Sequence, residues 1–282
     1  MHSVVCIKQV PDSTHIRVHP VTNTIMRQGV PAIVNPYDLF ALEEALRLRD
    51  RFGGRVTVVT MGPAQAETAL RKALSFGADE AILVTDKAFA GADTLATSYA
   101  LAAAIRRIDQ AFPVDLVFTG KQTIDGDTAQ VGPGIATRLS MQLLTYVSRI
   151  AEIDPDQREI VVERRAEGGV QVLGTRLPCL VTMLEDSNRM RFGSLPDALR
   201  AARQPIQVWN RTDAGVQDVT KIGLKGSPTI VSRVFTPKPR AQKAEMIAVE
   251  GGPAALAAAL LERIAACLPD RARAAQSAEA SR

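Results

Sequence analysis

Short apolar runs alternate with longer amphipathic segments along the first half of the chain. The runs cover residues 3–7, 55–61, 81–84 and 114–119, and each has the length and continuity of a buried parallel strand. The segments between them place apolar residues three or four positions apart, as amphipathic helices do. Strands that alternate with helices predict an α/β fold with a parallel sheet and right-handed crossovers.

Capping residues and glycines mark the ends of the expected helices. Asn35 can cap a helix whose first turn is favoured by Pro36 and Asp38, and Gly53-Gly54 can end it. Similar signals predict helices after the second and third strands. The helix after the third strand has its expected cap at Asp93-Thr94.

The pattern changes after Leu139. Runs at residues 143–150, 158–165, 170–173 and 179–183 are separated by turn signals, and we expect them to add antiparallel strands to the sheet.

The chain is expected to divide into three parts. Residues 1–184 form the α/β domain, with a hairpin-like excursion at residues 15–29. Residues 185–268 contain few core-forming strands, which suggests an arm that packs on a partner chain. Residues 269–282 are expected to be a disordered tail.

The segment Gly120–Ala136 is the strongest candidate for a ligand site. It follows the strand at 114–119 and leads into a helix for which Asp127 or Thr128 is the expected cap. In open parallel sheets ligands bind at the carboxyl ends of strands, and helix N-termini present free N–H groups to phosphates. An ordinary strand–helix turn is an equally good interpretation of these residues alone. Asp125 and Asp127 would repel a phosphate unless they turn outward, cap the helix or bind ribose.

Two common nucleotide motifs are absent from this segment. A Walker loop would need glycine at Asp115 and serine or threonine at Gln122. The sequence Gly132-Pro133-Gly134 lies too late, and contains proline, for a GxGxxG fingerprint.

Sheet topology gathers further segments around this loop. In the common doubly wound strand order the first and fourth strands are neighbours. The segment Cys6–Gln9 would then lie beside the Gly120 loop. The helix start at Asn35 and the turn at Met61–Pro63 reach the same end of the sheet. This convergence favours a nucleotide-binding crevice.

Composition excludes several other classes. Apolar residues make up 46% of the 282 positions and aromatic residues 4%, and the net charge is +4. The arginine-rich stretches lack accompanying aromatic residues, so we expect no nucleic-acid binding. None of the three cysteines belongs to a CxxC pair, which indicates a reducing compartment. The three N-terminal histidines show no metal-ligand spacing. No signal peptide or membrane-length apolar run is visible, so we expect a soluble, cytoplasmic protein without a metal.

Several motifs resemble those of electron-transfer flavoprotein β subunits over nearly the whole chain. The longest is VERRAEGGVQVLGTRLPCLVT at residues 162–182, and it is highly specific. VCIKQV at 5–10, MGPAQ at 61–65 and GKQ at 120–122 are also similar. DGDTAQVGP at 125–133 looks most like the electron-bifurcating branch, and the whole chain is most similar to the β subunit linked to nitrogen fixation.

The resemblance implies a fold and a set of cofactors. The fold would be a doubly wound, mostly parallel Rossmann-like sheet of the adenine-nucleotide α-hydrolase type, with antiparallel additions and a C-terminal arm on the α subunit. Ordinary β subunits hold a structural AMP. In bifurcating members FAD occupies this site, with its ADP part where AMP would lie, and NADH reduces it.

The resemblance also implies binding residues and a redox mechanism without a catalytic side chain. Electrons from NADH would pass singly toward a quinone oxidoreductase, through the α-subunit FAD, and toward a ferredoxin or flavodoxin that supplies nitrogenase. The implied cofactor-binding positions are Cys6, Asn35, Pro36, Tyr37, Asp38, Met61, Gly62, Pro63, Gly120, Lys121, Gln122, Thr123, Ile124, Asp125, Gly126, Asp127, Thr128, Ala129, Gln130 and Val131.

Two hypotheses concern the flavin ring. Gly62-Pro63-Ala64 would lie near the nicotinamide, and Arg164 or Arg165 near the isoalloxazine. A solvated strand face is an equally good interpretation of the two arginines.

One departure bears on the partner. Ser187 stands where ordinary family members present the leucine that anchors acyl-CoA dehydrogenases, so a different partner set is expected. Three functions remain open: a bifurcating β subunit, an ordinary β subunit with AMP, and an ATP-using enzyme or nucleotide sensor. The missing glycine-rich phosphate loop argues against the third.

Overall fold

A computed structural model describes residues 1–12, 17–18, 25–26, 31–232, 246–247 and 249–267. The chain forms two compact units, Met1–Phe235 and Thr236–Arg282, which are described separately. The predicted tail at 269–282 lies outside the described residues, as does most of the predicted excursion at 15–29.

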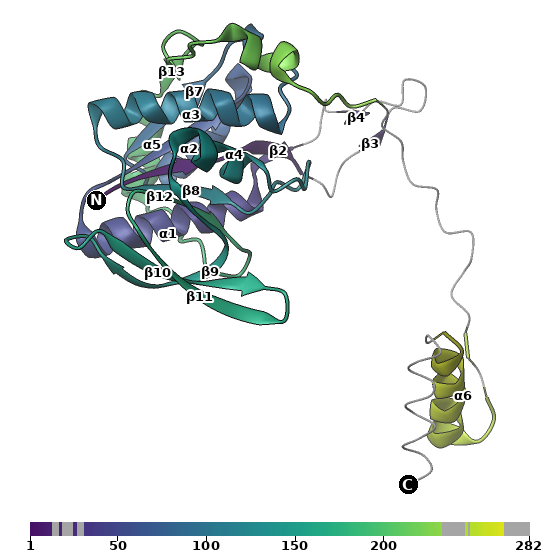
Figure 1. The fold of residues 1–282 in the computed structure, drawn as a ribbon. Helices are drawn as coiled ribbons and strands as arrows, with labels where there is room; N and C mark the ends of the chain where they lie inside the picture. The colour runs from purple at the N-terminus through teal and green to yellow at the C-terminus, as the bar shows by residue number, and fades with distance from the viewer. Residues whose placement is uncertain (13–16, 19–24, 27–30, 233–245, 248, 268–282) are drawn as a thin grey trace. The chain divides into compact units, whose positions relative to one another are not determined.

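The first unit contains one large sheet and two small two-stranded ones (Figure 1). The strands are β1 (His2–Cys6), β2 (Gln9–Pro11), β3 (Arg17–Val18), β4 (Ile25–Met26), β5 (Ala32–Val34), β6 (Arg55–Met61), β7 (Glu80–Val84), β8 (Leu116–Gly120), β9 (Gln142–Asp154), β10 (Glu159–Ala166), β11 (Gly169–Arg176), β12 (Cys179–Met183) and β13 (Gln207–Trp209). In the large sheet their order is β11-β10-β9-β12-β8-β1-β6-β7-β13.

Helices cover both faces of this sheet, which confirms the predicted doubly wound α/β fold. The helices of the first unit are α1 (Pro36–Phe52), α2 (Glu67–Ser75), α3 (Thr94–Ala111), α4 (Val131–Leu139) and α5 (Leu195–Arg203). Short 3-10 helices cover Ala64–Ala66, Lys87–Phe89, Val219–Lys221 and Gly223–Gly226. One apolar core lies between the sheet and α1, α2 and α5, and a second lies between the sheet and α3 and α4.

The predicted neighbours β1 and β8 are paired in parallel register, with Ser3 opposite Leu116 and Cys6 opposite Thr119. All their residues are buried, which is why both strands are mostly apolar. The carboxyl ends of the central strands therefore lie together at one edge of the sheet.

The predicted antiparallel character of the later strands is only partly right. β10 does run antiparallel to β9 and β11. However, β12 inserts between β8 and β9 and is parallel to both. All five residues of β12 are buried. An interior strand covered on both faces has no alternation to reveal its direction, so local turn signals gave the wrong orientation.

Residues after Glu185 contribute more to the sheet than their sequence suggests. β13 pairs in parallel with β7 at the sheet edge. Ala214 and Ile222 are buried in the core under α3. The expected packing of residues 185–268 on an α subunit stays a prediction.

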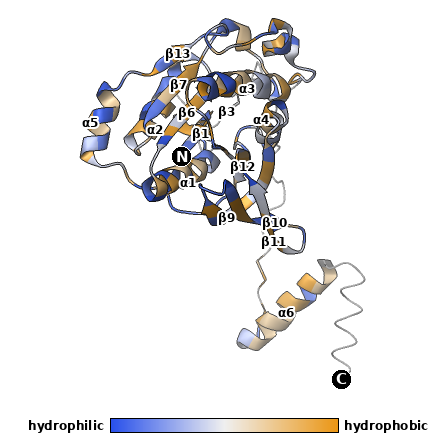
Figure 2. Cartoon of the chain, turned by 60° about the vertical axis from the view of Figure 1, so that its left-hand side comes forward, coloured by the Kyte–Doolittle hydropathy of each residue, from blue (hydrophilic) through white to orange (hydrophobic). Residues whose placement is uncertain are grey.

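The second unit contains helix α6 (Gly252–Cys267), which is rich in alanine and leucine. Its large apolar side chains are exposed, and Figure 2 colours much of the helix as hydrophobic. The described part of the molecule has no helix that is both long and apolar enough to cross a membrane.

Candidate functional site

The exits of β1 and β8 meet the start of α1 at the carboxyl edge of the sheet, where the sequence predicts the nucleotide-binding crevice. Strand register places Cys6 level with Val59 and Thr119, and Gly120 level with Met183. The structure therefore brings together the four segments that the sequence predicted to converge.

Asn35 joins the start of α1 to the loop after β8. Its side-chain nitrogen Nδ2 donates to the carbonyl of Gln122 at 2.9 Å, and its Oδ1 accepts from the backbone N–H of Ile124 at 3.2 Å. Asn35 occupies the N-cap position of α1 but makes no side-chain cap hydrogen bond. The predicted capping role is therefore wrong, because the loop competes successfully for the carboxamide.

Asp38 joins the ends of β1 and β8. Its carboxylate accepts from the backbone N–H of Lys8 at 2.7 Å and of Gly120 at 3.2 Å. Burial raises the pKa of Asp38 to about 7, although hydrogen bonds from Asn35, Lys8 and Gly120 favour the ionised form. A Cβ on Gly120 would lie 2.5 Å from Asp38 Oδ1 and 2.6 Å from the Cβ of Tyr37, so only glycine allows this close approach.

The two loop carboxylates that seemed incompatible with an anion have partners. Lys8 Nζ lies 2.7 and 2.8 Å from the two oxygens of Asp125. Gln122 Nε2 donates to Asp127 at 2.7 Å. The Lys8 ammonium offsets one negative charge, so the loop repels an anion less than its sequence suggested.

Helix α4 begins later than predicted. Its N-cap is Gln130, not Asp127 or Thr128, and no side chain caps it. Asp127 and Ala129 both have positive φ, 44° and 54°, so the backbone turns sharply before the helix starts at Val131. The first amides of a helix have no acceptor within the helix, so the N–H groups of Val131 and Gly132 have none inside α4.

Thr119 lies beneath this helix end. It is 6% exposed, and its Oγ1 is buried without a hydrogen-bond partner among the described residues. A Cβ on Gly132, in the first turn of α4, would lie 2.8 Å from Thr119 Oγ1. A buried hydroxyl without a partner is costly unless a ligand or water completes it. The Thr119 hydroxyl and the amides at the start of α4 thus lie close together, and we call this group the cradle.

A second polar group flanks the crevice. Lys121 Nζ lies 5.1 Å from the ring centroid of Tyr37, 5.9 Å from that of Tyr146, and 3.6 Å from a carboxylate oxygen of Glu185. Glu185 also accepts from Arg165 at 2.8 Å. Tyr146 has a φ of 57° inside β9, a strained conformation for a residue with a side chain.

The remaining predicted residues are less involved in the network. Arg164 donates to the carbonyl and hydroxyl of Thr145, so its guanidinium is held against β9. Burial raises the pKa of the Cys6 thiol to about 12, so Cys6 stays protonated and apolar. Gly62 and Pro63 follow β6, and the 3-10 helix directly after them is tied to the β1 exit because Gln9 Nε2 donates to the carbonyl of Gln65 at 3.2 Å.

Sequence reasoning did not single out Thr119, Tyr146 or Glu185. Thr119 had a weak signal, because it is a polar residue at the end of an apolar buried run. The other two reach the site only through the pairing of β9 with β12 and the exit from β12, which no local pattern specifies.

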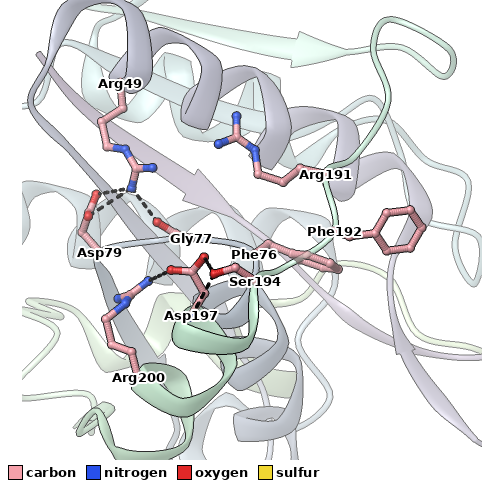
Figure 3. Close-up of a pocket in the computed structure, with 9 residues that line it drawn as sticks. All are labelled: Arg49, Phe76, Gly77, Asp79, Arg191, Phe192, Ser194, Asp197 and Arg200. Carbon is pink, nitrogen blue, oxygen red and sulfur yellow. Dashed lines mark hydrogen bonds and ion pairs between the residues drawn. The ribbon is translucent and has the colours of Figure 1, made fainter.

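Two cavities of the first unit are lined by residues outside this group. One, of about 670 Å³, includes His2, Phe112 and Trp209. The other, of about 390 Å³, is shown in Figure 3. Its lining residues are Arg49, Phe76, Gly77, Asp79, Arg191, Phe192, Ser194, Asp197 and Arg200.

The arginines of this smaller cavity are already paired. Arg49 lies 3.1 Å from Asp79, and Arg200 lies 3.5 Å from Asp197. Arg191 lies 2.9 Å from Glu43, outside the set drawn in Figure 3. The cavity is therefore built from ion pairs that hold the segment before α5 in place, and it offers no free cation.

Comparison with known proteins identifies the family of this chain. Residues 22–214 match the family model for the electron transfer flavoprotein domain. The chain is 71% identical over 265 residues to "Protein FixA" of Azotobacter vinelandii, with 94% of both chains covered.

Two further relatives are similar over most of their length. "Protein FixA" of Azorhizobium caulinodans is 68% identical over 248 residues, with 88% of each chain covered. "Electron transfer flavoprotein subunit beta" of Thermoanaerobacterium thermosaccharolyticum is 48% identical over 238 residues, with 84% of this chain and 88% of the relative covered. This chain therefore belongs to the electron transfer flavoprotein family and stands among its β subunits.

Proposed function

We propose that this chain is the β subunit of a cytoplasmic, bifurcating electron transfer flavoprotein, and that its crevice holds the FAD that NADH reduces. The carrying observation is the cradle at β8 and α4, where an uncapped helix end lies over the Thr119 hydroxyl, which no described residue hydrogen-bonds. Helix N-termini of this kind suit the phosphate of an adenine nucleotide.

The chain's own residues would bind and orient the nucleotide. Amides at the start of α4 and the Thr119 hydroxyl would donate to phosphate oxygens. Lys8 would reduce repulsion by keeping Asp125 neutralised. Gly120 and Gly132 would let the backbone approach closely, because a side chain at either position meets neighbouring atoms within 3 Å.

Bound FAD would supply hydride acceptance from NADH and one-electron transfer to two acceptors. The chain's part is electrostatic. Lys121 and Arg165 place positive charge beside the crevice, and Glu185 pairs with both. Positive charge near a flavin favours its electron-rich forms, so these side chains would tune its potential.

The proposed partners follow from family membership. A β subunit of this family pairs with an α subunit. For this chain we propose that one electron path runs through the α-subunit FAD to a quinone oxidoreductase. The other would reduce a ferredoxin or flavodoxin that supplies nitrogenase. The support for the nitrogen-fixation link is the high identity to proteins named FixA.

An ordinary carrier with AMP in the same crevice is the alternative. The cradle and the loop would serve AMP as well as the ADP part of FAD, because both place a phosphate after the adenosine. Flavin and AMP content of the heterodimer co-expressed with its α subunit distinguishes the two. Two FAD and no AMP per heterodimer is the expected result, whereas one FAD and one AMP would identify an ordinary carrier.

A matched pair of variants locates the nucleotide. Gly120→Ala places a methyl group against Tyr37 and Asp38 and should abolish nucleotide retention on this chain. Gly174→Ala meets only ordinary contacts at 3.8 Å in β11 and should retain it. Equal nucleotide content in both variants, or none in the unmodified heterodimer, would reject the proposed crevice.

A further inference from the structure

The side-chain carboxamide of Asn35 makes its hydrogen bonds within the protein. Asn35 is fully buried, and its Nδ2 donates to the carbonyl of Gln122 at 2.9 Å. Its Oδ1 accepts from the N–H of Ile124. The loop therefore uses both the nitrogen and the oxygen of this carboxamide. A direct role in nucleotide binding would require this network to open.

The same residue connects three segments that are distant in sequence. The backbone N–H of Asn35 donates to the carbonyl of Lys8 at 2.9 Å. Its side chain reaches the loop after β8, and Asp38 one turn later reaches both Lys8 and Gly120. The β1 exit, the start of α1 and the β8 exit are therefore fixed to one another through buried hydrogen bonds.

The hydrogen bonds of Asn35 to the loop leave helix α1 without a side-chain cap. Asn35 stands at the N-cap of α1, where its side chain would ordinarily accept from the helix's own amides. It instead binds the loop at Gln122 and Ile124. The loop contains residues with positive φ at Asp127 and Ala129, so it needs external restraint to keep one shape.

We propose that Asn35 is a positioning residue that holds the 122–124 segment in its binding shape before nucleotide arrives, and that it does not itself contact the nucleotide. This inference rests on the proposed function, because the shape matters only if the loop receives a nucleotide. Preorganisation improves affinity by removing the ordering cost at the moment of binding.

Asn35→Ala tests this directly in the co-expressed heterodimer. The variant should bind ADP about tenfold to a hundredfold more weakly after nucleotide depletion, because two loop hydrogen bonds are lost. Hydrogen–deuterium exchange at 122–124 should become faster in the nucleotide-free protein. The first readout is titration calorimetry with ADP, and the second is mass spectrometry of the loop peptide.

Asn188→Ala is the matched control. Asn188 Nδ2 also makes two hydrogen bonds, to the Phe40 carbonyl and to Glu44, each at 3.0 Å. Its removal should lower the melting temperature without changing ADP affinity or loop exchange.

The outcomes separate this inference from the proposed function. If Asn35→Ala lowers only the melting temperature, as Asn188→Ala does, the positioning role is wrong. If ADP affinity falls while loop exchange is unchanged, Asn35 is a direct ligand and the inference is overturned. If the unmodified heterodimer binds no ADP, the proposed function fails, whereas faster loop exchange in Asn35→Ala would still support the restraint.

Discussion

Asp38 is a carboxyl group whose ionisation is linked to the stability of the fold. Burial raises its pKa from 3.8 to about 7, while the amides of Lys8 and Gly120 hold its oxygens. Between these two pH values the folded chain keeps a proton that the unfolded chain has released. The contribution of Asp38 to the free energy of unfolding is therefore greatest below about pH 4 and is lost as the pH rises toward 7.

We predict that Asp38→Asn removes this part of the pH dependence. The variant should be less stable than the unmodified protein at pH 5, because a hydrogen-bond acceptor is lost, and the difference should shrink toward pH 8. Urea denaturation across this range measures it.

Asn35→Ala is the control for this prediction, because it disturbs the same network but keeps the Asp38 carboxyl group. Its deficit in stability should vary less with pH than that of Asp38→Asn. If the loss of stability in Asp38→Asn did not change with pH, Asp38 would be ionised throughout this range.

At the scale of elements, two threonines near the junction of β8 with α4 allow nucleotide binding and fold stability to be tested separately. Thr119 and Thr182 lie on adjacent parallel strands, directly opposite each other. The hydroxyl of Thr119 has no partner in the part of the chain that the structure describes, whereas that of Thr182 accepts from the Tyr146 N–H at 3.1 Å. The two residues are equally suited to a Thr→Val substitution, which keeps the side-chain shape.

We predict opposite effects for the two substitutions. Thr119→Val should leave the free energy of unfolding unchanged or slightly raised, because it removes an unsatisfied buried hydroxyl, and should weaken ADP binding about tenfold. Thr182→Val should lower stability by about 1–3 kcal/mol, because it orphans the Tyr146 amide, and should leave ADP affinity nearly unchanged. Unchanged ADP affinity in Thr119→Val would remove the hydroxyl from the proposed cradle.

The elements also show how far sequence reasoning reaches. Continuous apolar runs correctly predicted the central strands and the neighbours β1 and β8, because burial on both faces leaves a clear composition. The direction of β12 was not predictable, since the same composition suits either orientation. The short strand β13 was missed because two of its three residues are exposed.

The site was predictable to the level of loops but not of contacts. The segment Gly120–Val131 follows a predicted strand, so its position at the carboxyl edge follows from topology. The role of Asn35 was wrong because an asparagine before Pro36 satisfies every local rule for a cap. Only the tertiary fold shows that the Asn35 carboxamide donates to Gln122, 87 residues later in the chain.

At the scale of the whole molecule, the two units differ in how they bury apolar surface. The first has an apolar core on each face of its sheet. In the second, Leu256, Leu260 and Ile264 are spaced four residues apart along α6 and remain 44–48% exposed. Residues at this spacing lie on one face of a helix, and Leu261 widens the stripe. A stripe of this kind is typical of a helix that docks in a groove of a partner.

We predict that this stripe contributes to binding of the α subunit. Leu260→Glu places a charge in the middle of the stripe and should weaken the heterodimer at least tenfold, because burial of a leucine side chain contributes about 1.5–3 kcal/mol. Ala258→Glu is the control, because Ala258 lies on the opposite side of α6 and is exposed. Both variants should keep the melting temperature of the first unit, whose core does not include α6. Size-exclusion chromatography with light scattering at falling concentration measures dissociation. Equal dissociation of the two variants would mean that the stripe does not bind the α subunit, and the predicted arm would then be limited to residues before α6.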